Sequence, residues 1–371
     1  MMMLIVFLAI LVLSILFPRS RKVALLAMAF MLVMYCFVRY KGDLEIYQWI
    51  YEDYGVNLSG TTFEPGFTLL IIICKKLGMP FIQYRIVLGL IYVLLLNRGV
   101  SQLTEYRALA LTISAFFPFF IFTSVLRSGI ACVIILNGYR YLIDPAYGRG
   151  GLVRYALLVL LAATFHYSAA LMIVFVLARM RLNPAKLMRY LVVVIALTIL
   201  LNHTDIIYDL LSKITSREKL LQWFVRGEAT ANLTGTFAIL IVLGVNFLLA
   251  ARSRRLLSPA GTECGLYREE AQFVFNSSFL LFFFFPLMVF AAPFMRVAYM
   301  LMPLFIANTV NASFVNSRND RTEERFNRRL SLQCIMLIVS MAVWKFYYDL
   351  PYIKAGDIPL QELLRTHFWF G

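Results

Sequence analysis

The chain has little charge for its length. Only 15% of its 371 residues are Asp, Glu, Lys or Arg, whereas 61% are hydrophobic. A soluble core cannot hide that much apolar surface. No stretch longer than about thirty residues lacks a nearby apolar run, which excludes a separate large soluble domain. The composition therefore predicts an integral membrane protein in which residues 1–371 form a single domain within the lipid bilayer.

Acidic residues, histidine and cysteine are also scarce, with 20 Asp and Glu, three His and five Cys. The cysteines show no CxxC spacing and no pairing with histidine, so the sequence predicts neither a disulfide framework nor a metal site. The 35 Lys and Arg residues leave a net charge of +15. In a multi-span protein such an excess collects in cytoplasmic loops. It is therefore no argument for a nucleic-acid partner.

The N-terminal part of the chain is predicted to begin and return outside the cytoplasm. Residues 2–17 form an apolar run that basic residues follow rather than precede, the reverse of a secretory signal. We therefore expect a retained helix with its N-terminus outside. The next run, 23–38, returns the chain outward. It delivers the acidic segment 39–65 to the extracytoplasmic side.

In the second half, three basic loops alternate with apolar runs long enough to cross the bilayer. These loops cover residues 179–189, 252–268 and 318–329, and cytoplasmic loops are where basic residues concentrate. This arrangement places the segment 203–233 outside. The spans predicted between the loops are 190–202, 234–251, 273–290, 297–312 and 331–347.

The middle of the chain allows two topologies. In the first, residues 66–78 span the membrane and Arg127 lies inside. In the second, 66–78 is re-entrant or interfacial, and 152–178 is a helix pair that turns near His166 at the outer face. We prefer the second because it places five arginines in the cytoplasm: Arg98, Arg107, Arg140, Arg149 and Arg154. The expected fold is all-α and polytopic, with about 11–13 hydrophobic segments, some of them re-entrant.

Ionisable residues in or beside apolar runs are the candidate functional groups, because such residues are costly in a bilayer. Each has a structural interpretation as well: an interfacial anchor for an arginine, a helix contact for a histidine, and a favourable helix-terminal charge for the glutamate. In the preferred topology, all of them reach the same outer face. They are Asp43, Glu64, Arg127, His166 and Arg296, the last with Tyr299 three residues later on one predicted helix.

This set of residues suits an anionic lipid-linked substrate. A carboxylate can remove a proton from an attacking hydroxyl, and arginines can stabilise a diphosphate leaving group. Glycosyl transfer from a polyprenyl diphosphate donor needs both. Asp43 and Glu45 also have a spacing that can ligate a divalent ion, but two acids in a polar loop are usually only solvated, so we assign no metal. Nearby aromatic residues could stack on sugar faces: Tyr47, Trp49, Tyr51 and Tyr54.

Five short motifs give the chain a resemblance to a known family. They occur in order over about two thirds of the sequence, and each contains one of the candidate residues. The chain resembles the EpsG-like family of Wzy-type polysaccharide polymerases, although Ser128 stands where that family commonly has glutamine. The matching pieces are Gly42-Asp43 with Tyr47 and Tyr51, Glu64-Pro65-Gly66-Phe67, Leu126-Arg127-Ser128-Gly129-Ile130-Ala131, Phe165-His166-Tyr167-Ser168-Ala169-Ala170, and Arg296 with Tyr299.

The resemblance implies a GT-C-like membrane fold and a glycosyltransferase that works without a metal or other cofactor. It implies that undecaprenyl-diphosphate-linked oligosaccharide repeat units are joined at the outer, periplasmic face of the bacterial cytoplasmic membrane. The product would be O-antigen, capsule or exopolysaccharide, and a chain-length regulator protein would be a possible partner.

On this hypothesis each candidate residue has a role. Asp43 is the expected general base, with Glu64 as the alternative. His166 is expected to hydrogen-bond a phosphate or donate a proton. The diphosphates would be bound by Arg127 and Arg296, with Tyr299 orienting the latter.

Two other functions are compatible with parts of the sequence. A flippase for lipid-linked sugars would have ionisable residues lining a cavity from both faces and some internal symmetry, and neither is evident. An intramembrane serine hydrolase or acyltransferase would pair His166 with Ser124, Ser128 or Ser168. This is the weakest alternative, because no GxSxG motif is present and Ser168 would point away from His166 on a helix.

Overall fold

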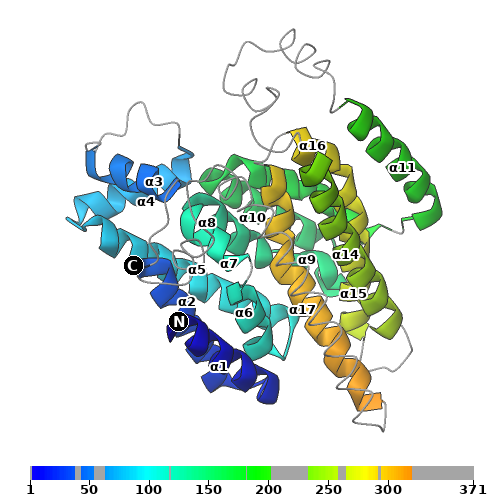
Figure 1. The fold of residues 1–371 in the computed structure, drawn as a ribbon, viewed down its shortest axis with the longest axis horizontal. Coiled ribbons are helices and arrows are strands. Elements are labelled where there is room, and N and C mark those ends of the chain that lie inside the picture. The colour runs from blue at the N-terminus through cyan, green and yellow to red at the C-terminus, as the bar shows by residue number, and fades with distance from the viewer. Residues whose placement is uncertain are drawn as a thin grey trace. The chain divides into compact units, whose positions relative to one another are not determined.

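The protein is built from helices. The computed structural model describes residues 2–37, 43–53, 63–116, 118–180, 182–201, 233–257, 265–290 and 294–319. Every regular element within these ranges is a helix (Figure 1), which confirms the predicted all-α fold. The predicted span 331–347 and nearly all of the predicted outer loop 203–233 lie outside the described residues.

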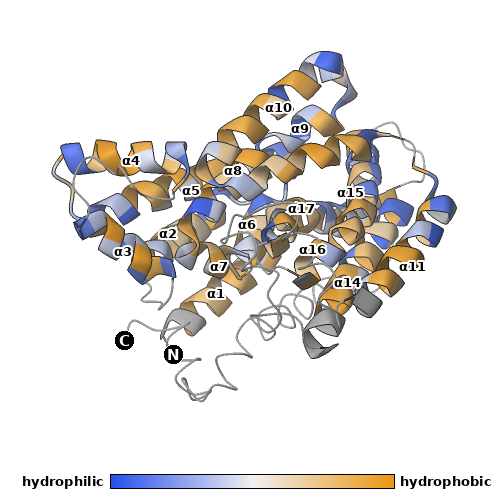
Figure 2. Ribbon diagram, turned by 90° about the horizontal axis from the view of Figure 1, so that it is seen from above, coloured by the Kyte–Doolittle hydropathy of each residue, from blue (hydrophilic) through white to orange (hydrophobic). Residues whose placement is uncertain are grey.

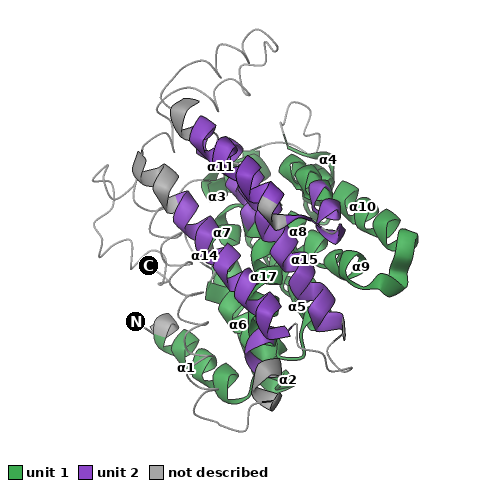
Figure 3. Cartoon of the chain, turned by 90° about the vertical axis from the view of Figure 1, so that its right-hand side faces the viewer, with its two compact units in different colours: residues 1–173, 299–311, 356–371 green, residues 174–298, 312–355 purple. Residues whose placement is uncertain are grey.

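The chain divides into two compact units (Figure 3). Unit 1 comprises residues 1–173, 299–311 and 356–371, and unit 2 comprises residues 174–298 and 312–355. In unit 1, the helix α5 packs against α2, α6 and α8, with the rings of Tyr35, Tyr84 and Tyr92 fully buried. The helices of this core are α1 (Met2–Leu16), α2 (Arg21–Phe37), α5 (Phe81–Leu103), α6 (Arg107–Phe116), α7 (Phe119–Ser124), α8 (Leu126–Leu136) and α9 (Tyr139–Ile143).

Two short helices of unit 1 lie between α2 and α5 in the sequence. The helix α3 (Asp43–Asp53) lies within the predicted acidic loop. This segment is helical because its apolar residues recur at helical spacing and are buried on one face. The helix α4 (Pro65–Lys76) starts with proline, whose missing N–H costs nothing at a first turn. Its 12 residues extend about 18 Å, too little to cross a hydrocarbon core of about 30 Å. This length favours the topology in which residues 66–78 do not span.

The segment around His166 is broken as predicted. The short 3-10 helix η1 (Pro145–Tyr147) leads into α10 (Gly148–Phe165), which ends at His166, where the backbone is extended with φ −157° and ψ 116°. The chain then continues as a second 3-10 helix, η2 (Tyr167–Arg179). A 3-10 helix of 13 residues is unusually long, and the hydrophobic pattern gave no sign of it.

Unit 2 contains α11 (Pro184–Leu201), α14 (Leu233–Leu257), α15 (Gly265–Phe283) and α16 (Phe285–Phe290). The helices α14 and α15 pack together through Phe247, whose ring lies 4.7 Å from that of Phe279. Much of the loop predicted at 252–268 is helical, because both helices continue past their apolar stretches into basic residues.

Within the described ranges, three helices are long and apolar enough to cross a membrane. They cover Phe81–Leu103, Pro145–Phe165 and Met295–Phe314, the last within α17 (Met295–Asn319). Shorter apolar helices cover Ile5–Leu16, Arg107–Phe116 and Tyr167–Arg179. Figure 2 shows hydrophobic residues along most helices and hydrophilic ones mainly near their ends. The protein is therefore an all-α, polytopic membrane protein.

Candidate active site

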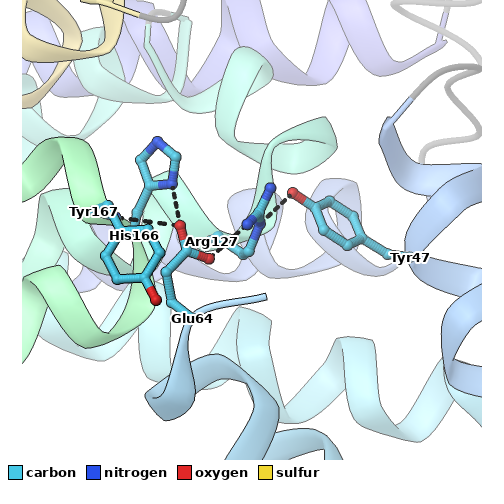
Figure 4. A network of polar contacts seen from close by, with 5 residues as sticks. All are labelled: Tyr47, Glu64, Arg127, His166 and Tyr167. Atoms are coloured by element: carbon cyan, nitrogen blue, oxygen red, sulfur yellow. Dashed lines mark hydrogen bonds and ion pairs between the residues drawn. The ribbon is translucent and has the colours of Figure 1, made fainter. Parts of the chain in front are cut away.

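The carboxylate of Glu64 lies at the centre of a buried polar cluster in unit 1 (Figure 4). Glu64 occupies the position before α4, but its side chain makes no capping hydrogen bond to that helix. The structural interpretation, in which this residue serves only its own helix terminus, therefore does not account for it. The side chain is 3% exposed and is directed toward residues from α8 and from the break after α10.

Both carboxylate oxygens of Glu64 are engaged. Oε2 accepts a hydrogen bond from Arg127 Nη1 at 2.5 Å, and Oε1 accepts one from the backbone N–H of Tyr167 at 3.2 Å. His166 Nδ1 lies 3.1 Å from the same Oε1. Because an ionised carboxylate only accepts, this contact requires a proton on Nδ1. The motifs of Arg127 and His166 lie 63 and 102 residues from Glu64 along the chain, and both meet the motif of Glu64 at its carboxylate.

Arg127, in the first turn of α8, is held on several sides. Nε donates to the hydroxyl of Tyr47 at 3.1 Å, and the guanidinium carbon lies 4.6 Å from the centre of the Phe63 ring, a cation–π distance. Nε and Nη1 are thus occupied, whereas Nη2 has no hydrogen-bond acceptor within the described ranges. Because the side chain is 18% exposed, Arg127 retains donors for a ligand.

Two motif glycines allow the helices to approach closely enough to form the cluster. A Cβ on Gly66 would lie 2.4 Å from Thr164 Oγ1 and 3.0 Å from the Thr164 carbonyl oxygen, so the start of α4 fits against the end of α10 only without a side chain. A Cβ on Gly129 would lie 2.9 Å from Phe122 Cβ. These contacts bring Glu64 to His166 and set α8 against α7.

The electrostatics keep Glu64 ionised. Burial alone would raise the pKa of this carboxyl, but the hydrogen bond from His166 and the positive charge of Arg127 outweigh it and lower the pKa from 4.5 to about 2. A carboxylate with so low a pKa is a weak proton acceptor. Its position suits a fixed anion that orients Arg127 and His166.

Asp43 lies in the first turn of α3 and is half-buried. It precedes Tyr47 by four residues, so the two share one face of the helix, and Tyr47 contacts Arg127. Glu45 is exposed and points about 200° away around the helix axis, so it does not converge with Asp43 on a shared ion. Asp43 is thus one helical turn from the polar cluster.

The aromatic residues of α3 have roles that the sequence did not reveal. Tyr47 and Tyr51 are buried, so the predicted stacking on sugars is wrong for both. Tyr47 binds Arg127, and Tyr51 donates to the Met79 carbonyl at 2.7 Å. Trp49 is exposed, and Tyr54 lies outside the described residues.

Arg296 and Tyr299 both lie near the start of α17, as their spacing predicted. Arg296 belongs to unit 2 and Tyr299 to unit 1, where its buried ring packs edge-on against Phe122 at 6.4 Å. Their diphosphate-binding roles stay predictions. Ser124, one of the serines considered for a hydrolase, donates its hydroxyl to the Ile121 carbonyl at 2.9 Å.

One buried cation was missed by the sequence analysis. Arg85, in α5, is 6% exposed, and its Nη2 donates to the carbonyl oxygen of Tyr35 at 2.5 Å. That carbonyl belongs to the last turn of α2, where backbone acceptors lack helical partners and a positive charge is favourable. Arg85 therefore stabilises the end of α2, just before the segment that leads to Asp43.

The helices and the polar cluster define an integral membrane protein with a buried ionic site beside the end of a candidate span. The chain belongs to the EpsG family, whose model matches residues 26–354 and thereby covers every residue of the cluster. Family membership indicates a membrane role of the polysaccharide-polymerase type. No curated protein and no solved structure matches the chain significantly.

Proposed function

We propose that the protein is a Wzy-type glycosyltransferase with a GT-C-like fold. It would join undecaprenyl-diphosphate-linked repeat units at the outer face of the bacterial cytoplasmic membrane. The observation that supports this most is the fixed guanidinium of Arg127, which is bound by Glu64 and Tyr47, lies beside His166, and keeps Nη2 for a ligand.

In this mechanism Arg127 stabilises the leaving group. The acceptor hydroxyl forms a bond to the anomeric carbon of the donor sugar, and the bond from that carbon to the diphosphate oxygen breaks. The departing diphosphate gains negative charge. Arg127 stabilises this charge without reorganising, because the contacts of Arg127 already hold its guanidinium in place. For Arg296, oriented by Tyr299, we keep the diphosphate-binding role that the sequence predicts.

Asp43 accepts the proton that the acceptor hydroxyl loses, since Glu64, with its low pKa, is a weak base. This changes the role of Glu64 from an alternative base to an anchor for Arg127 and His166. With Nδ1–H bound to Glu64, His166 presents Nε2 on the opposite side of its ring. When that nitrogen is protonated, it donates a hydrogen bond to the diphosphate.

The test is complementation of a strain that lacks the gene, with the surface polysaccharide resolved by size on a gel. Arg127→Lys should retain part of the ladder and Arg127→Ala none, because the charge matters more than the shape. Asp43→Asn should leave only the single repeat unit. Glu64→Gln should also lose the ladder. Glu105→Gln provides a matched control, because its carboxylate pairs with Arg19 at 2.9 Å in an exposed position.

The pattern of bands separates the proposal from a flippase. Retention of a single repeat at the surface with loss of the ladder means that export works and polymerisation does not. Loss of every band, including the single repeat, would instead indicate an export step. Equal activity of Arg127→Lys and Arg127→Ala would contradict the leaving-group role.

A further inference from the structure

Arg154, in the second turn of α10, is fixed against the segment that joins α9 to α10. The guanidinium carbon of Arg154 lies 5.6 Å from the ring centres of both Tyr141 and Tyr147. The two rings meet edge to face, 5.0 Å apart with an interplanar angle of 81°. Arg154 is exposed but is positioned by these cation–π contacts, so its charge is held at one place on the surface.

The turn itself is tightly closed. A Cβ on Gly151 would lie 2.4 Å from the carbonyl oxygen of Tyr141, so α10 begins directly against the end of α9. Gly148 adopts a φ of +50°, which favours glycine. Asp144 accepts a hydrogen bond from the Ala146 N–H at 3.0 Å. The turn therefore has a fixed backbone conformation, which positions the arginines near it.

An apolar stripe, formed by Val153 and the leucines at 157, 160 and 161, runs along α10 from this turn. Arg149 and Val153, four residues apart, share one face of the helix with the leucines one and two turns later. The apolar residues of the stripe are each 48–64% exposed, whereas the opposite face is buried against the protein. Figure 2 shows the hydrophilic turn at one end of α10 and its hydrophobic body beyond. The stripe consists of Val153, Leu157, Leu160 and Leu161.

The dimensions of the stripe match one leaflet of a bilayer. From Arg149 to Leu161 the helix rises about 18 Å, close to half of a hydrocarbon core of about 30 Å. The helix belongs to a candidate span, so the exposed leucines face acyl chains. The cations lie at the headgroup end of this span, and His166 lies at its other end.

We propose that this surface binds an anionic phospholipid, with its phosphate on Arg149 and Arg154 and one acyl chain along the stripe. Charge complementarity supports this occupant, because residues 139–154 contain three arginines and a single acid, Asp144. That acid faces Arg140 at 4.0 Å rather than the other two arginines. The site is separate from the proposed catalytic cluster, which lies at the opposite end of α10.

The test is native mass spectrometry of the full chain in a neutral detergent, titrated with phosphatidylglycerol and with phosphatidylcholine. Each cation near an anionic lipid contributes about fivefold to affinity, so Arg149→Gln with Arg154→Gln should weaken phosphatidylglycerol binding about 25-fold. The affinity for phosphatidylcholine should hardly change. Arg149→Gln alone, which leaves the Arg154 stack intact, should show about a fivefold loss.

The matched control is Lys186→Gln with Arg189→Gln in α11, which removes the same charge from exposed positions. It should bind phosphatidylglycerol like the wild type. An equal loss in the control would show a diffuse charge effect and overturn the proposal. Competition by free glycerol phosphate would also overturn it, because it would indicate an anion site without an acyl component. Unchanged lipid binding with loss of a co-purifying protein would assign the surface to a protein partner instead.

Discussion

At the scale of single residues, Arg127 is organised before any substrate arrives. Its partners come from two separate segments: Tyr47 lies on α3, and Phe63 and Glu64 directly precede α4. Removing one member of a buried ion pair typically costs about 3–5 kcal/mol, because the other charge is left uncompensated. The cluster therefore contributes to stability as well as to the geometry of the site.

The hydroxyl of Tyr47 should matter for activity more than for folding. Tyr47→Phe keeps the buried ring but removes the acceptor for Arg127 Nε, and a hydrogen bond to a charged group is worth about 1.5–3 kcal/mol. We expect at least a tenfold lower rate of polymer formation, with a normal elution profile of the purified protein. An in vitro assay with purified lipid-linked repeat units measures the rate.

Tyr51→Phe is the control for this prediction. It removes a hydroxyl from the same helix, but that hydroxyl binds the Met79 carbonyl rather than Arg127. It should lower the thermal stability slightly and leave the rate near that of the wild type. Equal losses of rate in both variants would show that the hydroxyls act through the packing of α3 alone.

The ionised state of Glu64 gives a stability difference with a defined pH dependence. Its pKa is lowered to about 2 in the folded protein from an ordinary value of 4.5. A depressed pKa stabilises the fold above about pH 4.5, and this contribution is lost as the pH falls toward 2. The difference in unfolding temperature between the wild type and Glu64→Gln should therefore shrink from pH 5 to pH 3. A difference that stays constant or grows in acid would contradict the assignment.

The sequence predicted that Glu64, Arg127 and His166 share a site, because ionisable residues beside apolar runs are rare and the preferred topology directs all three outward. The structure brings them together. The sequence could not predict the contact of Tyr47 with Arg127, since the two are 80 residues apart and an aromatic side chain gives no sign of its partner. Nor does any local pattern identify Phe63, whose ring faces the same guanidinium.

At the scale of secondary structure, the close approach of α4 to α10 determines whether the cluster can form. Gly66→Ala should push the two helices apart, because the new Cβ would meet Thr164 Oγ1 at 2.4 Å. We expect a strong loss of activity and a lower unfolding temperature. Adding Thr164→Ala removes the closest contact but leaves the backbone oxygen at 3.0 Å, so the double variant should recover activity only in part.

Gly244→Ala is the control for this substitution. Gly244 lies in the interior of α14, and a Cβ there would meet nothing within 4 Å. Alanine is favoured over glycine in a helix by up to about 1 kcal/mol, so this variant should be as stable as the wild type or slightly more. If both glycine variants lost activity equally, the steric argument at Gly66 would be wrong.

Elements with a strong pattern were predicted more reliably than those without one. The break near His166 followed from local residues, as did a helix terminus at Glu64, and both are present. The helix α3 was not predicted because its four acidic residues led to its assignment to an acidic loop, although its apolar residues recur at helical spacing. The basic ends of α14 and α15 were assigned to a loop because the sequence criterion followed hydrophobicity, and a helix can continue beyond the hydrocarbon.

At the scale of the whole molecule, the two ends of α10 should be reached from opposite sides of the membrane. We expect a cysteine at position 149 to react with an impermeant maleimide only from the cytoplasm, and one at position 167 only from outside. Tyr167 suits this test because its side chain is exposed. The described native cysteines Cys36, Cys74 and Cys132 are buried, and Cys264 and Cys334 would be replaced by serine.

A cysteine at position 157 is the control for this experiment. Leu157 is exposed on the protein surface but lies in the middle of the candidate span, so lipid should shield it from the reagent on both sides. Labelling of positions 149 and 167 from the same side would contradict the orientation of α10. Labelling of position 157 would show that this helix faces water.

The 3-10 conformation of η2 affects how far a short sequence can reach. At about 2.0 Å per residue, the 13 residues of Tyr167–Arg179 extend about 26 Å, whereas an α-helix of that length would extend about 20 Å. Hydropathy windows of about 19 residues are calibrated on the α-helical rise, and they reject a segment this short. If such a segment crosses the bilayer but is not counted as a span, every later loop is assigned to the wrong side of the membrane. To predict the topology of a chain with such a segment, the minimum length accepted for a membrane span must therefore depend on the type of helix.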